Sequence, residues 1–176
     1  MIDRMLRAAS LDVSLYNEVE NDPRFTSEAF LVVVISSLAL GLGSIVNSGV
    51  GGIVVGTLSA LGGWALWSYL TYIIGTTVLR TPETNATWGQ LLRTIGYASS
   101  PGVIRILALI GPLAAVVIGA AAVWMLITAV IAVRQALDYR STARAVVVCI
   151  IGWAIQITII LILNVFGLAF LVAGTG

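Results

Sequence analysis

Apolar residues dominate the chain in three long segments that carry no charge, residues 29–79, 106–133 and 145–176. Each segment is long enough for at least one helix of about 20 residues, the length that crosses the hydrocarbon core of a membrane. The first is long enough for two helices, joined at the turn-forming sequence Asn47-Ser48-Gly49. The pattern therefore predicts an all-α integral membrane protein.

The number of spans depends on the segment between the first two charge-free runs. Residues 91–110 are mainly apolar but include Arg93, Pro101 and Arg105, so this segment alone fits either an interfacial helix or a further span. If it crosses, the protein is a five-transmembrane-helix bundle. The predicted spans are then about 27–46, 52–79, 95–110, 113–133 and 145–172.

The positions of the arginines favour the five-span arrangement. With five spans, every Arg except Arg105 falls in the segments 1–26, 80–94 and 134–144, which all lie on one side. The opposite turns carry no charge. Cytoplasmic loops are enriched in basic residues, so this topology places the N-terminus in the cytoplasm and the C-terminus outside, in a plasma (inner) membrane. With four spans, the loop at 134–144 would move to the outer side with three Arg.

Two parts of the chain follow from this pattern: an N-terminal segment, 1–26, and a membrane domain, 27–176. Within the first, apolar residues such as Ile2, Leu6 and Val13 recur at helical spacing through residue 22, where Asp22-Pro23 ends the helix. We expect one cytosolic amphipathic helix. It either lies on the membrane surface or under the bundle, or it binds a partner.

Composition excludes several classes of function. The chain is 59% hydrophobic and 10% charged, with a mean hydropathy of +1.05 and a net charge of +1, so no basic patch for nucleic acid is expected. It has no His, and its single Cys is Cys149. Without His, Lys or a paired carboxylate in the membrane domain, we expect no catalytic, metal or cofactor-binding site, and therefore no enzyme.

Small residues recur at four-residue steps in two predicted spans. Such rows let helices approach closely in a membrane. Either the rows pack within the bundle or they form the seam of a homo-oligomer. The candidate packing residues are Gly52, Gly56 and Ala60 in the second span, and Gly111, Ala115 and Gly119 at the start of the fourth.

Three polar residues fall inside predicted spans and form a candidate intramembrane site. Arg105 lies six residues before Gly111, so its side chain either reaches the outer interface or faces a polar cavity or a bound anion. Gln156 and Asn164 are eight residues apart and share one helix face. They either form hydrogen bonds between helices or line a pore.

Three short motifs mark the ends of predicted spans: NDPRFTSEAFLVVV entering the first, LLRTIGYASSPG entering the third, and WMLITAVIAVRQALDY leaving the fourth. With these motifs the chain resembles the Yip family of Ypt/Rab-interacting multispan proteins, specifically its prokaryotic branch. The resemblance implies five helices behind a cytosolic N-terminal segment, and no catalysis. Eukaryotic relatives bind prenylated Rab GTPases, but the acidic Asp-Leu-Tyr-Gly-Pro motif of those relatives is missing here, so we do not extend Rab binding to this chain.

Two hypotheses for the function follow. The first is a non-enzymatic scaffold, accessory subunit or membrane-organising protein, whose partners are membrane lipids and either other membrane-protein subunits or further copies of itself. The alternative is a small oligomeric channel or carrier for an ion or small solute, lined by Arg105, Gln156 and Asn164. Because a permeation path needs polar residues across the whole bilayer and this chain has few, the first hypothesis is favoured.

Overall fold

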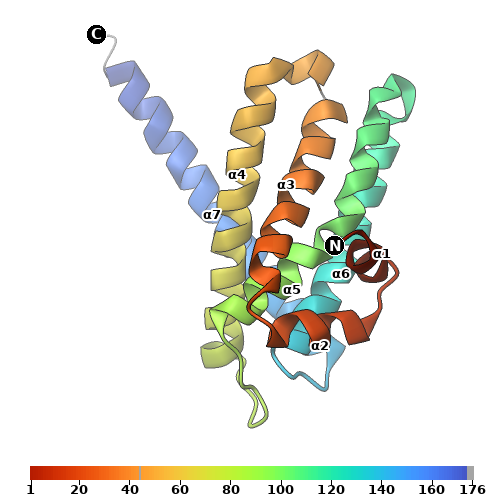
Figure 1. The fold of residues 1–176 in the computed structure, drawn as a ribbon. Helices are drawn as coiled ribbons and strands as arrows, with labels where there is room; N and C mark the ends of the chain where they lie inside the picture. Colours follow the sequence, from red (N-terminus) through yellow and green to blue (C-terminus); the bar gives the residue numbers. More distant parts are fainter. Residues whose placement is uncertain (44, 174–176) are drawn as a thin grey trace.

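The structure is a computed structural model that describes residues 1–43 and 45–173, with side chains described for 1–43, 45 and 49–165. Helices make up nearly all of this part of the chain (Figure 1). The α-helices are α1 (Ile2–Ala9), α2 (Val13–Asn21), α3 (Phe25–Gly43), α4 (Ile45–Ile73), α5 (Trp88–Ala98), α6 (Ala114–Ala136) and α7 (Thr142–Ala173), with a π-helix, η1 (Ile74–Val78), and two 3₁₀-helices, η2 (Ser100–Leu109) and η3 (Gly111–Leu113).

Four segments are long and apolar enough to cross a membrane: Phe25–Gly43, Gly49–Val78, Gly111–Ala136 and Thr142–Val165. They agree with four of the five predicted spans. The turn between the first two lies where the sequence placed it, because the backbone of α4 breaks at Gly49 (φ 61°, ψ −176°), a conformation that glycine alone adopts without strain. The protein is therefore an all-α, multi-pass membrane protein.

The segment predicted as the remaining span corresponds to α5 and η2, which are not among these four. Gly96 of α5 lies against Ala29 near the start of α3, and the backbone of Arg105 in η2 lies against Gly43 at the end of α3. The α5–η2 segment therefore runs beside α3 from one end of the bundle to the other, as Figure 1 shows. This segment begins at Trp88, earlier than the predicted start at 95.

The change from α-helix to 3₁₀-helix has a local cause at Pro101, which has no N–H to donate. The carbonyls that lose their α-helical donors find other partners: the Ser100 hydroxyl donates to Tyr97 O (2.6 Å) and the Thr128 hydroxyl to Ala98 O (2.6 Å). A 3₁₀-helix rises about 2 Å per residue against about 1.5 Å for an α-helix. The extended geometry helps a short segment to cross.

The N-terminal segment forms two helices, where the sequence analysis expected one. The chain turns between them at Leu11, which has a positive φ of 64°, and the Asp12 side chain then caps α2 by accepting from Ser14 N (2.9 Å). Leu15 and Tyr16 of α2 are fully buried, and α2 packs on α5 and α6. The break allows two short amphipathic faces to follow the shape of the bundle, which one straight helix does not.

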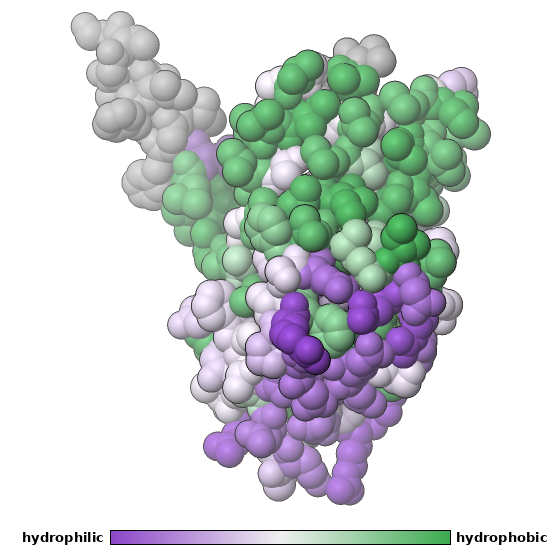
Figure 2. Space-filling model, viewed as in Figure 1, coloured by the Kyte–Doolittle hydropathy of each residue, from purple (hydrophilic) through white to green (hydrophobic). Residues whose placement is uncertain are grey.

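The surface is divided into an apolar half and a polar half (Figure 2). The end of α3, the start of α4 and the turn before α6 lie at the apolar end, and the loops after η1 and after α6 lie with α2 at the polar end (Figure 1). All charged residues except Arg105 belong to segments at that polar end. The structure thus gathers on one side the loops whose arginines the topology prediction used.

Candidate functional site: the polar end of the bundle

Arg93 of α5 is the buried charge that fixes α2 to the bundle. Its side chain is 6% exposed. It donates to Val19 O (2.8 Å) and to Glu20 O, two of the carbonyls that end α2, and more distantly to the hydroxyl of Thr26 (3.5 Å). The last carbonyls of a helix lack donors from within the helix and carry its negative dipole end, so a guanidinium here satisfies both needs.

A second set of polar contacts ties α1 to α2, α3 and α5. Arg4 pairs with Glu18 of α2 (3.1 Å) and with Glu28 of α3 (3.0 Å). Glu28 also accepts a hydrogen bond from the Tyr97 hydroxyl of α5 (2.6 Å). Arg7 pairs with Glu18 (2.8 Å). One carboxylate therefore bridges three elements, which makes the N-terminal segment a fixed part of the polar end.

Glu20, near the end of α2, has a carboxyl group that is only partly satisfied. Its Oε2 atom is buried without a hydrogen-bond partner. Burial, and then the negative charge of Asp138, raise the pKa of Glu20 to about 7, whereas Arg93 lowers it. The ionisation of this carboxyl therefore falls near neutral pH.

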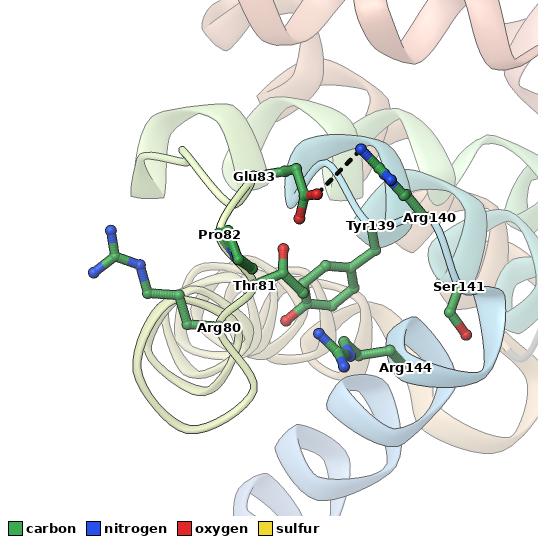
Figure 3. Close-up of a pocket in the computed structure, with 8 residues that line it drawn as sticks. All are labelled: Arg80, Thr81, Pro82, Glu83, Tyr139, Arg140, Ser141 and Arg144. Atoms are coloured by element: carbon green, nitrogen blue, oxygen red, sulfur yellow. Dashed lines mark ion pairs between the residues drawn. The ribbon is translucent and has the colours of Figure 1, made fainter.

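A basic pocket of about 400 Å³ lies between the loop after η1 and the turn from α6 to α7. Figure 3 shows that Glu83 faces Arg140, to which it is ion-paired at 3.1 Å, and that Arg144 lies beside Tyr139. Arg80 extends outward from the opposite wall. The name basic pocket is used below for the cavity lined by Arg80, Thr81, Glu83, Tyr139, Arg140 and Arg144.

Tyr139 and Arg134 hold this pocket in shape. The Tyr139 hydroxyl is within hydrogen-bond distance of two carbonyls of the opposite wall, Gly75 O within η1 (3.0 Å) and Leu79 O directly after it (2.9 Å). Arg134, at the end of α6, donates to Tyr139 O (3.2 Å) and to the Thr142 hydroxyl (3.2 Å). The two walls are therefore joined, because η1 belongs to one and the α6–α7 turn to the other.

Arg105 lies partly buried in the bundle, and its guanidinium does not reach the outer interface. It donates to Ser36 O (2.9 Å) and to the Ser36 hydroxyl (2.7 Å) in the middle of α3, and to Gly102 O (2.9 Å). The absence of a side chain at Gly102 leaves room for this pairing, because a Cβ there would meet Ser36, Arg105 and Met125. The guanidinium of Arg105 is therefore bonded within the bundle, to α3 and η2.

The structure does not bring the three predicted intramembrane residues together. Gln156 of α7 donates to Gly63 O of α4 (3.2 Å), a hydrogen bond between helices. Asn164 is exposed and donates within α7, to Ile160 O (2.8 Å). Arg105 bonds instead to α3 and η2. The three side chains donate to carbonyls in different parts of the bundle, so they do not line one polar path.

Three of the predicted packing glycines face open space, and not the inside of the bundle. A Cβ added at Gly56, Gly111 or Gly119 would meet nothing within 4 Å. Ala115 is exposed, while Gly52 and Ala60 are partly buried. These three glycines therefore do not serve contacts within one chain. The close approaches occur elsewhere, at Gly43, Gly75, Gly96 and Gly102.

Sequence reasoning missed the two most specific features of the polar end. It used Arg93 and the arginines of the basic pocket only to orient the chain, and it assigned no contact to Tyr97 or Tyr139. Two signals were present in the sequence. One is the single Arg of the amphipathic stretch that became α5, Arg93, and the other is the three arginines in or next to the two loops on one side, Arg80, Arg140 and Arg144. Across the described residues, no group of three or more His, Cys, Asp or Glu is placed to hold a metal ion.

These observations define a polytopic, all-α membrane protein with a structured polar end. The model of the Yip1 domain matches residues 15–172, which includes most of α2 and nearly all of the membrane domain. The chain therefore belongs to the Yip family. No curated protein and no solved structure was found to match it.

Proposed function

We propose that this chain is a non-enzymatic scaffold or accessory subunit that organises other components of the plasma (inner) membrane. Its polar end faces the cytoplasm, and the N-terminus lies there. The far end of α7 is on the outer side. This orientation is supported by the arginines, because every one except Arg105 belongs to the polar end and basic residues favour the cytoplasmic side.

The observation that carries the proposal is the fixed attachment of α1 and α2. Ion pairs and a buried arginine hold both helices against the bundle, so they present a defined surface. Asn17, Glu18 and Asn21 lie exposed on α2. A rigid polar surface suits a partner that is recognised by shape and hydrogen bonds, because little ordering entropy is lost when it binds. The partners proposed are other membrane-protein subunits or a second copy of this chain, together with lipids.

A channel or carrier has less support. Arg105, Gln156 and Asn164 each donate to a backbone carbonyl in a different part of the bundle. A permeation path requires polar groups that are aligned across the bilayer and free to contact the solute.

The test is native mass spectrometry of the protein released gently from its own membranes, combined with site-specific photocrosslinking. A photoreactive residue at Asn21 of α2 is expected to link to a defined second chain, whereas one at Val123, a lipid-exposed position on α6, is not. A monomer without crosslinks at Asn21, together with solute flux above that of empty liposomes, would overturn the scaffold in favour of the channel.

The orientation has its own test. In a Cys149→Ala background, a cysteine at Ser48, in the turn at the apolar end, is expected to react with an impermeant reagent added outside intact cells. A cysteine in place of Arg140, in the basic pocket, is expected to react only after the cells are opened. Equal labelling of the two positions in intact cells would contradict the proposed topology.

A further inference from the structure

The basic pocket is where positive charge remains uncompensated. Across the described residues, the other arginines of the polar end have strong partners: Arg4, Arg7 and Arg24 pair with carboxylates, and Arg93 and Arg134 donate to carbonyls. In the pocket, only Arg140 has an acidic partner, Glu83. Among the described residues, neither Arg80 nor Arg144 has an ion pair; the guanidinium carbon of Arg144 lies 5.7 Å from the centroid of the Tyr139 ring. Three arginines and one glutamate leave a net charge of +2.

The start of α7 adds to this positive potential. The helix begins at Thr142 and has no acidic residue in its first turn, where Arg144 stands instead. The first N–H groups of a helix are the positive end of its dipole, so an arginine at that position is unfavourable unless an anion lies close by. The charge in the first turn of α7 is therefore opposite in sign to the charge that favours a helix start.

The walls of the pocket continue directly into lipid-exposed surface. Val78 lies two residues before Arg80 and is 71% exposed, and Val147 lies one turn after Arg144 and is 42% exposed. Trp88 and Tyr69 form an exposed aromatic pair near the same end of the bundle, with ring centroids 5.6 Å apart. Aromatic residues of this kind gather at the headgroup level of a membrane. An anion in the pocket therefore has apolar surface beside it for acyl chains.

We propose that the basic pocket binds the phosphate group of an anionic membrane lipid. Arg144 donates charge-assisted hydrogen bonds to the phosphate oxygens, and the exposed side chain of Arg80 turns inward from the rim of the pocket to add its own. The acyl chains lie along Val78 and Val147. Glu83 competes with the phosphate for Arg140, so the acid limits the affinity. Tyr139 keeps the two walls at a fixed separation through its hydrogen bonds to η1. The site is independent of which protein partner the polar end contacts.

The experiment uses the full chain in a neutral detergent, titrated with phosphatidylglycerol or with phosphatidylcholine of the same acyl chains, and bound lipid is counted by native mass spectrometry. Phosphatidylglycerol is expected to bind about tenfold more tightly. Arg80→Gln and Arg144→Gln are each expected to weaken it by about tenfold, the effect of one lost charge-assisted hydrogen bond. Glu83→Gln is expected to strengthen it, because it frees Arg140.

Arg24→Gln is the matched control, since Arg24 is an exposed arginine at the same end of the bundle but outside the pocket. It is expected to change lipid binding less than twofold. A second arm measures glycerol phosphate by calorimetry on the same protein. If glycerol phosphate binds as tightly as the lipid, the ligand is a free phosphate and the lipid assignment falls. If Arg24→Gln weakens phosphatidylglycerol binding as much as the pocket variants do, the attraction is general and the site is overturned.

Discussion

The two halves of this bundle are held together in different ways. The polar end has fully buried side chains, such as Tyr16, Tyr97 and Leu137, and specific hydrogen bonds join its helices. At the apolar end, Gly56, Gly111 and Gly119 face open space, the most apolar stretch of Gly49–Val78 has no buried residue, and α7 leans away from α4 (Figure 1).

This difference follows from the two solvents. Within lipid, burying an apolar side chain against another helix gains little, because lipid tails are as apolar as the side chain. Association there needs close packing or hydrogen bonds, which this chain uses at a few points, such as Arg105 with Ser36. Near the interface, water makes apolar burial favourable again. The polar end therefore defines the arrangement, and the apolar end is available for lipid or for a further helix.

The largest expected effect is at Arg93. Arg93→Leu removes the donors to Val19 O and Glu20 O and leaves both carbonyls buried without partners. A hydrogen bond from a charged group contributes about 1.5–3 kcal/mol, so we expect a loss of about 3 kcal/mol and detachment of α2. The measurements are thermal unfolding in detergent and hydrogen exchange of the α2 amides.

Arg24→Leu is the control for Arg93. It removes an exposed arginine that pairs with Asp22, and because solvent screens an exposed pair, we expect little change in stability. If both variants leave exchange in α2 unchanged, Arg93 does not hold this helix.

The second expected effect contrasts two glycines, one from each half. Gly96→Ala would place a Cβ 2.8 Å from the Cβ of Ala29 and 3.1 Å from its carbonyl oxygen. Overpacking of this kind costs about 1–3 kcal/mol. Gly119→Ala meets open space within one chain, so it is expected to be neutral or to stabilise the helix by up to about 1 kcal/mol. Thermal unfolding of the two variants measures the difference.

The same pair of variants tests the oligomer seam that the rows of small residues suggested. If Gly119→Ala destabilises the protein as much as Gly96→Ala does, then the outer face packs against another chain and the contrast between the halves does not hold for the assembly. Size measurements of the two variants in detergent would detect the loss of that contact.

The third effect is a pH dependence of α2 docking through Glu20. Its pKa is raised from 4.5 to about 7 in the docked state, so between these values the docked state binds more protons than the undocked state. Stability is therefore fully present below about pH 4.5 and is lost as the pH rises through about 7. Melting temperatures between pH 5 and 8 measure this slope. Glu20→Gln should abolish it, and an equally steep slope in that variant would assign the dependence to another group.

The smallest expected effect is at the boundary between the halves. Trp124 of α6 donates its indole N–H to Ala9 O at the end of α1 (2.8 Å). Trp124→Phe keeps the ring but removes this hydrogen bond, so we expect a loss of about 1 kcal/mol and faster hydrogen exchange in α1 only. Trp153→Phe, at an exposed position of α7, is the control. Unchanged exchange in α1 would show that apolar contacts alone hold it.

The sequence by itself determined the class of protein, four of the spans and the side of the bundle on which the arginines gather. These features depend on composition along the chain, since a span needs a run of about 20 apolar residues whatever surrounds it. The turn at Gly49 was also predictable, because few residues other than glycine adopt that backbone. The GYASSP stretch marked the third passage, through the resemblance to the Yip family.

Only the tertiary structure decided which residues meet. Arg93 binds the end of α2, which lies more than seventy residues away in the chain, and Arg105 binds Ser36 of α3. Of the predicted packing glycines, Gly56, Gly111 and Gly119 face outward, whereas Gly96 and Gly102 make close contacts. The same holds for the basic pocket, whose arginines come from the loop after η1 and, far along the chain, from the turn before α7 and the start of α7. Such pairings depend on the relative rotation of helices, and apolar spans carry almost no periodic signal for rotation because nearly every face is apolar.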